Sequence, residues 1–336
     1  MDKMPLVSVL VTPYNQKDYI RQTLDSILMQ RCNFDFEVVV GEDCSTDGTR
    51  EICQEYALRH PDRIVLCLNE SNKGLLNNYF DIFRVARGKY LADCGGDDYW
   101  LTDSKLQEQV DILETHSDVS MVAGNWQLLE QKTGKLNKPA SWIEQDWYQP
   151  DVYGQQAISN YLNSNEIPRM VLAASCFRGD WARELYERHM ELFRGSDVVC
   201  EDLPLTLGLL QRGPFYFSNS NWLVYRVLEK SLSHSESREN YMRGFAFPAF
   251  QQTLQLVQTL GVSMQELNPY VKQKAADFTL HAFLSADMPF LENLGRLLTK
   301  YGWKPSLKHW LLRCCMRVPA MASLLRKQYL KRKKQP

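Results

Sequence analysis

Two adjacent carboxylates follow a pair of glycines in residues 94–100, which read CGGDDYW. The segment comes directly after the apolar run 90–92, which is typical of the end of a buried strand. Mg²⁺ and Mn²⁺ prefer oxygen ligands and share them with phosphate groups. Asp97 and Asp98 on such a turn therefore suit a divalent cation, although an acidic pair after a strand is more often a solvated turn.

Strand and helix patterns alternate through the first third of the chain. Short apolar runs predict buried strands at 6–12, 36–41, 63–69, 89–94 and 119–125. Helical patterns separate them over 19–30, 49–59, 75–87 and 102–116. This alternation predicts a sheet of parallel strands with helices on both faces.

The carboxyl ends of such strands form the edge at which the sheet binds ligands. Thr12 and Tyr14 follow the first predicted strand, and Asp43 follows the second. Asp43 could accept a hydrogen bond from a nucleotide base on whose ring Tyr14 stacks. Turn and cap chemistry is the competing interpretation, for Asp43 and above all for Asp47. Because no P-loop and no dinucleotide fingerprint is present, a bound diphosphate would need a cation as its counter-ion.

The composition is that of an ordinary globular protein, with 44% hydrophobic and 24% charged residues. We expect neither a transmembrane helix nor a signal peptide, since no apolar run is long enough and the first residues enter a strand at once. The nine cysteines are scattered and form no C-x-x-C pair. They indicate reduced thiols in a cytoplasmic protein rather than disulfides or a zinc site.

Four segments together resemble the successive motifs of the inverting glycosyltransferases of family 2, which have the GT-A fold. They read VSVLVTPYNQKDYIRQTLDSILMQ, GEDCSTDGT, NKGLLNNYFDIFRVARGKY and CGGDDYWLTDSKLQEQVDIL. The resemblance is most specific to bacterial members that build surface polysaccharide or lipopolysaccharide. It implies an α/β fold, with a mixed Rossmann-like sheet flanked by helices.

The resemblance covers residues 5–125 closely and extends more loosely to 235. It implies a GT-A domain over 1–235, with a nucleotide-sugar half (1–125) and an acceptor half (126–235). The helical pattern of 236–336 predicts a C-terminal extension outside that resemblance.

The resemblance also implies roles for the residues at the sheet edge. Thr12, Tyr14 and Asp43 would hold the nucleoside of a nucleotide-diphospho-sugar, with a UDP-sugar favoured. Asp97 and Asp98 would form the D-x-D-type motif, in which Asp98 binds Mn²⁺ or Mg²⁺.

A second acidic pair, Glu201-Asp202, matches the acid that the family places on the acceptor side. We predict Asp202 as the general base, because a single displacement at the anomeric carbon needs a carboxylate to take the proton of the acceptor hydroxyl. Capping of a helix N-terminus is the competing interpretation. Arg226 and His234 are predicted to close over the diphosphate, although a plain surface position is more ordinary for His234.

The chain departs from the family's motifs at two points. Residues 78–80 read Asn-Tyr-Phe where the family often has Ala-Arg-Asn, so an arginine that would face the nucleotide is missing. No Q-x-x-R-W motif occurs, which favours a non-processive enzyme of the hexosyltransferase type. The alternatives are a sugar nucleotidyltransferase, which needs a Gly- and Lys-rich loop where this chain has Pro-Tyr-Asn at 13–15, and a catalytically silent sugar-nucleotide-binding scaffold.

The charge is distributed unevenly along the chain. Twelve of the 39 Lys and Arg residues follow Glu292, and none of the 40 Asp and Glu residues does. With Trp303 and Trp310 among these basic residues, 296–334 is predicted to bind an anionic membrane surface. The chain would then be peripheral on the cytoplasmic face of the inner membrane, where a glycan or lipid-linked glycan serves as acceptor. No nucleic-acid-binding motif accompanies the basic residues, and a solvated tail is the competing interpretation.

Overall fold

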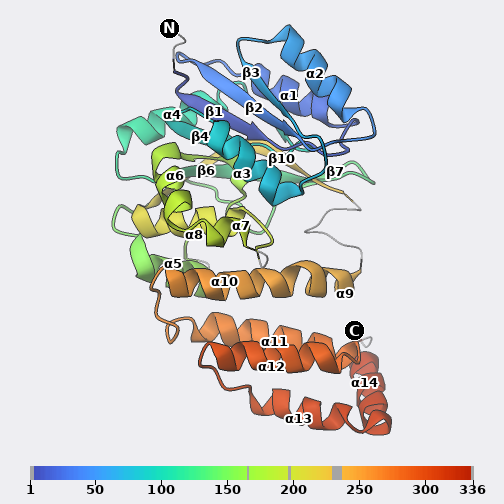
Figure 1. Cartoon of the computed structure of the whole chain (residues 1–336). Helices are drawn as coiled ribbons and strands as arrows, with labels where there is room; N and C mark the ends of the chain where they lie inside the picture. Colours follow the sequence, from blue (N-terminus) through green and yellow to red (C-terminus); the bar gives the residue numbers. More distant parts are fainter. Residues whose placement is uncertain (1–3, 165, 196–197, 229–236, 334–336) are drawn as a thin grey trace. The chain divides into compact units, whose positions relative to one another are not determined.

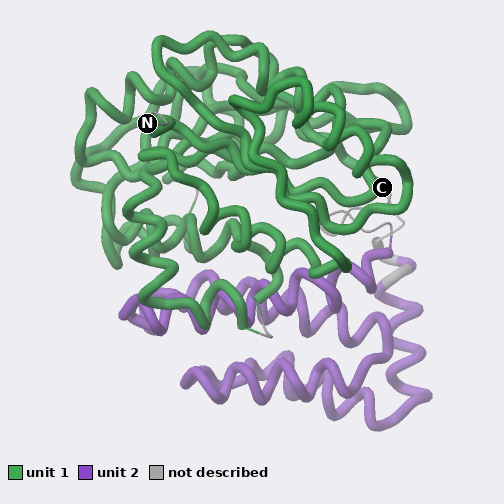
Figure 2. The backbone as a smooth tube through the Cα atoms, turned by 45° about the horizontal axis from the view of Figure 1, so that its top comes forward, with its two compact units in different colours: residues 1–228 green, residues 229–336 purple. Residues whose placement is uncertain are grey.

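The computed structural model describes residues 4–164, 166–195, 198–228 and 237–333. The chain divides into two compact units, Met1–Leu228 and Glu229–Pro336 (Figure 2). The boundary predicted at 235/236 lies outside the described residues.

Unit 1 is built on one mixed sheet, in the order β3-β2-β1-β4-β9-β6-β10-β5 (Figure 1). The strands of this path are β1 (Val7–Val11), β2 (Phe36–Glu42), β3 (Ile64–Leu68), β4 (Tyr90–Asp93), β5 (Tyr99–Trp100), β6 (Met121–Glu130), β9 (Ser175–Arg178) and β10 (Phe215–Val227). Strands β1 to β4 pair in parallel, whereas β9 is antiparallel to both β4 and β6. Two short strands lie off this path: β7 (Lys135–Asn137) pairs with β6, and β8 (Trp147–Tyr148) pairs with β10.

The helices of unit 1 pack on this sheet or on one another. They are α1 (Ile20–Leu28), α2 (Thr49–Arg59), α3 (Leu75–Val85), α4 (Lys105–Thr115), α5 (Gly154–Asn163), α6 (Gly179–Arg188), α7 (Glu191–Arg194) and α8 (Asp202–Arg212), with the 3₁₀ turn η1 (Leu172–Ala174). The pattern of α1 predicts one apolar face made of Ile20, Leu24, Ile27 and Leu28; the first three are fully buried and Leu28 is half-buried. The predicted mixed α/β sheet with flanking helices is confirmed.

The middle of the chain differs in detail from its predicted elements. Residues 169–178, whose apolar pattern suggests one strand, contain the 3₁₀ turn η1 and pair only over β9, where Arg178 is buried and donates to three main-chain carbonyls. The polar segment 130–170, whose weak periodicity suggests loops and short helices, includes β7, β8 and the ten-residue helix α5. These strands are too short to show a period of two, so only pairing with long neighbours reveals them.

Unit 2 is helical, as predicted. It contains α9 (Arg238–Tyr241), the π-helical turn η2 (Met242–Ala246), α10 (Phe247–Thr259), α11 (Asn268–Leu284), α12 (Met288–Lys300), α13 (Leu307–Met316) and α14 (Pro319–Lys333). Its core includes an aromatic cluster in which Phe247 lies 5.3 Å from Phe278 and 4.8 Å from Phe290 between ring centres. Among the described helices, none has the length and apolar character needed to cross a membrane.

Candidate active site

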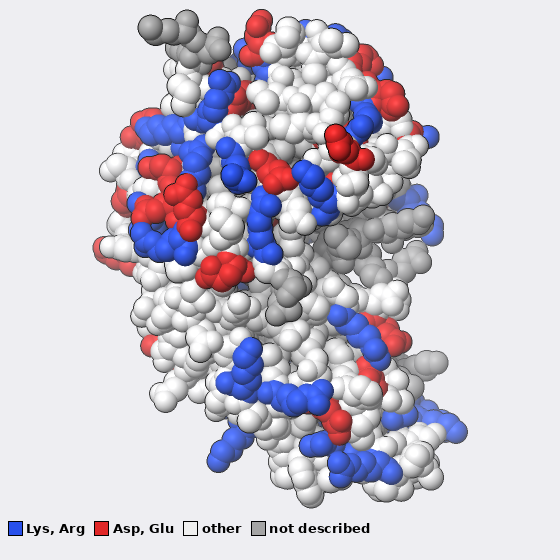
Figure 3. All heavy atoms as spheres, in the orientation of Figure 1, with Lys and Arg blue, Asp and Glu red and all other residues white. Residues whose placement is uncertain are grey.

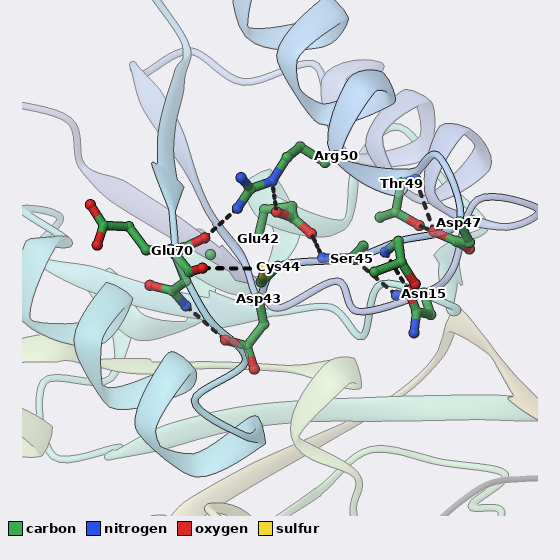
Figure 4. A network of polar contacts seen from close by, with 12 residues as sticks. Asn15, Glu42, Asp43, Cys44, Ser45, Asp47, Thr49, Arg50 and Glu70 are labelled. Carbon is green, nitrogen blue, oxygen red and sulfur yellow. Dashed lines mark hydrogen bonds and ion pairs between the residues drawn. The ribbon is translucent and has the colours of Figure 1, made fainter.

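The loops after β1 and β2 are fastened to each other at the carboxyl edge of the sheet (Figure 4). The N–H of Asn15 donates to Ser45 Oγ at 3.0 Å, and the N–H of Thr46 donates back to Asn15 Oδ1 at 2.9 Å. Asp47 accepts from the N–H of Thr49 at 3.0 Å, at the start of α2. The turn interpretation of Asp47 is therefore confirmed, whereas the N-cap residue of α2 is Gly48, where no side-chain cap hydrogen bond forms; the paired loops line this edge of the sheet.

Glu42 and Arg50 connect the ends of β2 and β3 (Figure 4). The fully buried Glu42 carboxylate accepts from Arg50 Nε at 2.6 Å and from the N–H of Ser45 at 2.7 Å. The same guanidinium donates to the main-chain oxygen of Asn69, the residue after β3. Breaking an ion pair that contains a buried carboxylate is costly, so the Glu42–Arg50 pair fixes the spacing of the two strand ends.

Asp43 is 2% exposed and holds the segment that follows β3. Its carboxylate accepts from Asn69 Nδ2 and from the N–H groups of Lys73 and Gly74, each at 2.9 Å. Since a carboxylate offers about four acceptor positions, one direction remains for a ligand N–H. The contact with a nucleotide base that was predicted for Asp43 stays a prediction.

The other two predicted nucleoside contacts lie on the loop after β1. Tyr14 is 44% exposed, so its ring is accessible to a ligand. Thr12 is half-buried directly after the strand. Both residues stand at the same edge as Asp43 because β1 and β2 are parallel neighbours.

The Asp97–Asp98 turn packs tightly against the loop after β1. A Cβ at Gly96 would lie only 3.0 Å from Pro13 Cα, so a glycine permits this approach. Thr23 of α1 places its hydroxyl 2.6 Å from the main-chain oxygen of Asp98. The turn is therefore anchored to both β1 and α1, and Asp98 is only 3% exposed.

The two carboxylates of this turn face the same space. A Cβ at Gly95 would lie 3.1 Å from both Asp97 Oδ1 and Asp98 Oδ2. Burial raises the pKa of Asp97, and burial together with the charge of Asp97 raises the pKa of Asp98 well above its usual value. A site that brings two buried carboxylates together fits a hard divalent cation, whose charge removes the repulsion.

Further ligands for such a cation would come from outside the protein. Within the described part of the chain, no three His, Cys, Asp or Glu side chains are grouped so that they could hold a metal ion. Mg²⁺ commonly uses one or two carboxylates and completes its shell with water and substrate phosphates. The turn is thus suited to a cation that arrives with a phosphate ligand.

Arg226 of β10 is buried against the acidic turn. Its N–H donates to Asp98 Oδ1 at 2.8 Å, and its guanidinium donates to the main-chain oxygen of Asp97. The guanidinium also lies 5.0 Å from the ring centre of Tyr19 and 4.8 Å from that of Tyr99. These contacts give Arg226 a positioning role, and its predicted contact with a diphosphate stays a prediction. His234 lies outside the described residues.

Glu201 and Asp202 begin helix α8. No side-chain cap hydrogen bond is formed at Glu201, the N-cap position, so capping does not account for it. Both residues are half-buried, but protein surrounds their carboxyl groups, and the buried Glu201 Oε2 has no hydrogen-bond partner among the described residues. Burial raises the pKa of Asp202 to about 6, and burial with the charge of Asp202 raises that of Glu201 well above its usual value.

Asp93, which was not predicted, connects the two acidic pairs. It ends β4 and is 9% exposed, and burial followed by the charge of Asp202 raises its pKa to about 7. The charge of Asp93 in turn contributes to the raised pKa values of Asp98 and Glu201. The signal in the sequence was a single acid in the run YLAD, on a strand predicted to be buried.

Tyr79 and Lys105 are two further residues that sequence reasoning missed. Burial and the negative charge of Asp93 raise the pKa of the fully enclosed Tyr79 hydroxyl well above its usual value. Lys105 is fully buried, lies 4.0 Å from the ring centre of Trp100 and donates to Gln109 Oε1 at 2.8 Å. Burial lowers the pKa of Lys105 to about 8, and its positive charge opposes the rise in the pKa of Asp93.

Comparison with known proteins gives both sequence and structural relatives. The model of the family described as Glycosyl transferase family 2 matches residues 8–170. TuaG of Bacillus subtilis, which its name assigns provisionally to teichuronic acid biosynthesis as a glycosyltransferase, is 36% identical over 232 residues, covering 67% of this chain and 89% of TuaG. WfaP of Escherichia coli, named UDP-Glc:alpha-D-GlcNAc-diphosphoundecaprenol beta-1,3-glucosyltransferase, is 34% identical over 33% of this chain and 43% of WfaP.

Other relatives match a shorter part of their own length. An uncharacterized protein of Mycobacterium tuberculosis is 38% identical over 138 residues, so the match spans 40% of that protein and 40% of this chain.

Two solved structures share the fold at low sequence identity. S. aureus TarS 1–349 in complex with UDP-GlcNAc superposes with a TM-score of 0.63 at 17% identity, covering 95% of this chain and 88% of TarS 1–349. The mannosyltransferase PcManGT from Pyrobaculum calidifontis, in complex with GDP-Man and Mn²⁺, gives a TM-score of 0.51 at 18% identity, covering 96% of this chain and 87% of PcManGT.

Proposed function

Because the chain belongs to glycosyltransferase family 2, we propose that it transfers one sugar from a nucleotide-diphospho-sugar to a hydroxyl of a growing cell-surface glycan, with inversion at the anomeric carbon. One observation carries the proposal. Two separate acidic pairs, Asp97–Asp98 and Glu201–Asp202, are coupled electrostatically through Asp93 at the end of β4, because the charge of Asp202 raises the pKa of Asp93 and the charge of Asp93 raises that of Asp98. One set suits the cation of a diphosphate and the other a general base.

The donor would bind at the edge formed by β1, β2 and the Asp97–Asp98 turn. Tyr14 would stack on the base, Asp43 would accept its N–H in the direction left open, and Thr12 would contact the nucleoside. UDP is the favoured nucleotide, since TarS is solved with UDP-GlcNAc and WfaP is named for UDP-Glc. GDP is the alternative, since PcManGT binds GDP-Man.

Asp98, with Asp97 beside it, would hold the divalent cation. When bound, Mn²⁺ or Mg²⁺ supplies positive charge that neutralises the leaving diphosphate. Mn²⁺ is supported by its presence in the PcManGT complex. Arg226 keeps the turn in place from beneath through its contacts with Asp97 and Asp98.

Asp202 would act as the general base of a single displacement. The acceptor hydroxyl gives its proton to the Asp202 carboxylate while its oxygen forms a bond to the anomeric carbon. The bond from that carbon to the diphosphate oxygen breaks at the same time, and the nucleoside diphosphate leaves. A raised pKa suits this role because a stronger base removes the proton more readily.

The acceptor would be a glycan, either free or linked to a lipid at the cytoplasmic face of the membrane. The name of WfaP, with its diphosphoundecaprenol acceptor, supports a lipid-linked one. The enzyme would add single sugars as a hexosyltransferase and would not be processive.

The proposal is tested by calorimetric titration of UDP, and separately GDP, into the full chain with and without Mn²⁺. We expect UDP to bind in a Mn²⁺-dependent manner, and hydrolysis or transfer assays with UDP-sugars then identify the sugar. If neither nucleotide binds, with or without Mn²⁺, the donor half of the proposal is wrong. Binding of UDP without turnover of any UDP-sugar or acceptor would favour a silent binding protein.

The pH dependence of turnover should report the Asp202 region. The base acts when unprotonated, so kcat should fall by about tenfold per pH unit below a pKa of about 6 and level off above it. Asp93 and Glu201 face Asp202 and titrate with it, so the midpoint belongs to these three carboxyl groups together. The pKa values of Tyr79, Tyr161 and Cys200, which also face Asp202, are raised above their ordinary values, so these groups stay protonated over this range. Rates at saturating donor from about pH 5 to pH 8 measure this fall in kcat, and a flat pH profile would contradict Asp202 as the general base.

A further inference from the structure

Helix α13 has two faces of different character. On the inner side His309 and Cys315 are 4% and 5% exposed, so this side holds the helix in unit 2. On the outer side Leu307, Trp310 and Leu311 are 73%, 57% and 51% exposed. Their spacing of three and four residues places them along one line of the helix surface. The packing of α13 therefore leaves an apolar stripe without a partner in unit 2.

Exposed apolar side chains also occur in the turn after α13 and in α14. Val318, Met321, Leu324 and Leu325 are 50%, 44%, 58% and 40% exposed, whereas Ala322 is 1% exposed and packs inward. Exposed apolar groups gathered in this way are rare on a monomer unless they bind a partner or a membrane. We call the outer side chains of these two helices, at 307, 310, 311, 318, 321, 324 and 325, the α13–α14 face.

Exposed basic side chains lie in the same helices as the α13–α14 face and next to them in the chain. The exposed ones are Lys304, Lys308, Arg317, Lys327 and Lys331. Within the described residues none of these five makes an ion pair, and no Asp or Glu follows Glu292 in the whole sequence. On the side of unit 2 seen in Figure 3, Lys and Arg predominate over Asp and Glu.

We propose that the α13–α14 face binds an anionic lipid bilayer, with both helices lying in the interface. Exposed Leu, Met and Trp side chains suit the boundary between headgroups and acyl chains, and flanking Lys and Arg suit anionic headgroups. This proposal rests on the proposed function at one point, since an enzyme bound to the membrane would reach a lipid-linked acceptor there.

The same observations disfavour the other occupants. A second copy of the chain would bring two positive surfaces together with no acid between them, which costs energy at short range. Nucleic acid would pair with the basic residues, but its phosphates offer no partner to Leu307, Leu311 or Leu324.

Vesicle sedimentation of the full chain tests the proposal. The protein should pellet with vesicles of equal parts phosphatidylglycerol and phosphatidylcholine and remain in solution with phosphatidylcholine alone. The double variant Trp310→Gln and Leu311→Gln should lower binding to the anionic vesicles by about tenfold or more, because its polar side chains no longer enter the interface. Leu58→Gln on α2 is the matched control, since Leu58 is 83% exposed in unit 1, and it should bind as wild type does.

Several results would overturn the proposal. Failure of the wild type to pellet with anionic vesicles, or equal binding by the double variant, excludes the α13–α14 face as a membrane site. If the wild type does not bind vesicles but forms a dimer that is lost in the double variant, the face binds a second copy of the chain. If the wild type binds a DNA duplex but not vesicles, the basic residues bind nucleic acid. UDP titration of the same proteins keeps the two proposals apart, because vesicle binding does not require the carboxylates of unit 1.

Discussion

Replacing Asp202 with asparagine is expected to lower kcat by about 10²–10⁴-fold while Mn²⁺-dependent UDP binding stays near that of the wild type. Asparagine has nearly the same shape as aspartate but cannot take the acceptor proton at neutral pH. Steady-state rates at saturating donor and acceptor, with calorimetric titration of UDP, measure the two quantities separately.

The stability of this variant separates a catalytic from a structural effect. Burial raises the pKa of Asp202 in the folded chain, so its charge destabilises the fold as the pH rises above the pKa of the unfolded chain. Asp202→Asn removes that charge and should melt at the wild-type temperature or above it at neutral pH. Loss of turnover together with a lower melting temperature would point to a structural effect instead.

Glu201→Gln and Asp93→Asn are the matched controls for this experiment. Each replaces a neighbouring carboxyl group by an amide of the same size, and neither residue is assigned the acceptor proton. We expect both variants to keep most of the activity. The acidic limb of the pH profile should shift to lower pH, because Asp202 ionises more easily when one acidic group fewer faces it. If Glu201→Gln abolished turnover while Asp202→Asn did not, the general base would be Glu201.

Replacing Asp98 is expected to remove the Mn²⁺-dependent part of UDP binding, a loss of about 100-fold or more, since a metal ion contributes several kcal/mol of charge stabilisation. Asp98→Asn removes the negative charge but keeps the hydrogen bond to the turn, because its amide oxygen can still accept from the N–H of Arg226 as Asp98 Oδ1 does at 2.8 Å. Calorimetric titrations of UDP with and without Mn²⁺ give the metal-dependent part directly.

Two further variants support this measurement. Gly95→Ala keeps both carboxylates but adds a methyl group 3.1 Å from Asp97 Oδ1 and Asp98 Oδ2, so it should also weaken Mn²⁺-dependent binding. Asp62→Ala removes an exposed carboxylate outside the site and should bind as wild type does. Wild-type Mn²⁺ dependence in Asp98→Asn would contradict the assignment of the cation to this turn.

Several parts of the site depend on contacts that no local pattern contains. Asp93 lies in an apolar run, and only the folded chain shows that Asp202 raises its pKa. Arg226 was expected to reach a diphosphate, yet its guanidinium is occupied with Asp97 and Gln22. Burial and charge coupling depend on distances between residues far apart in the chain, which strand and helix periods do not encode.

The amino-acid sequence by itself determined the order of the strands and helices in the first 125 residues and the residues at the strand ends. These follow from local rules, since a period of two or 3.6 and a turn residue act within a few positions. Parallel strands then bring Thr12, Asp43 and Asp97 to one edge. Only the tertiary structure decided which carboxylates face each other, and which apolar side chains of α13 and α14 remain outside a core, because both depend on how distant elements pack.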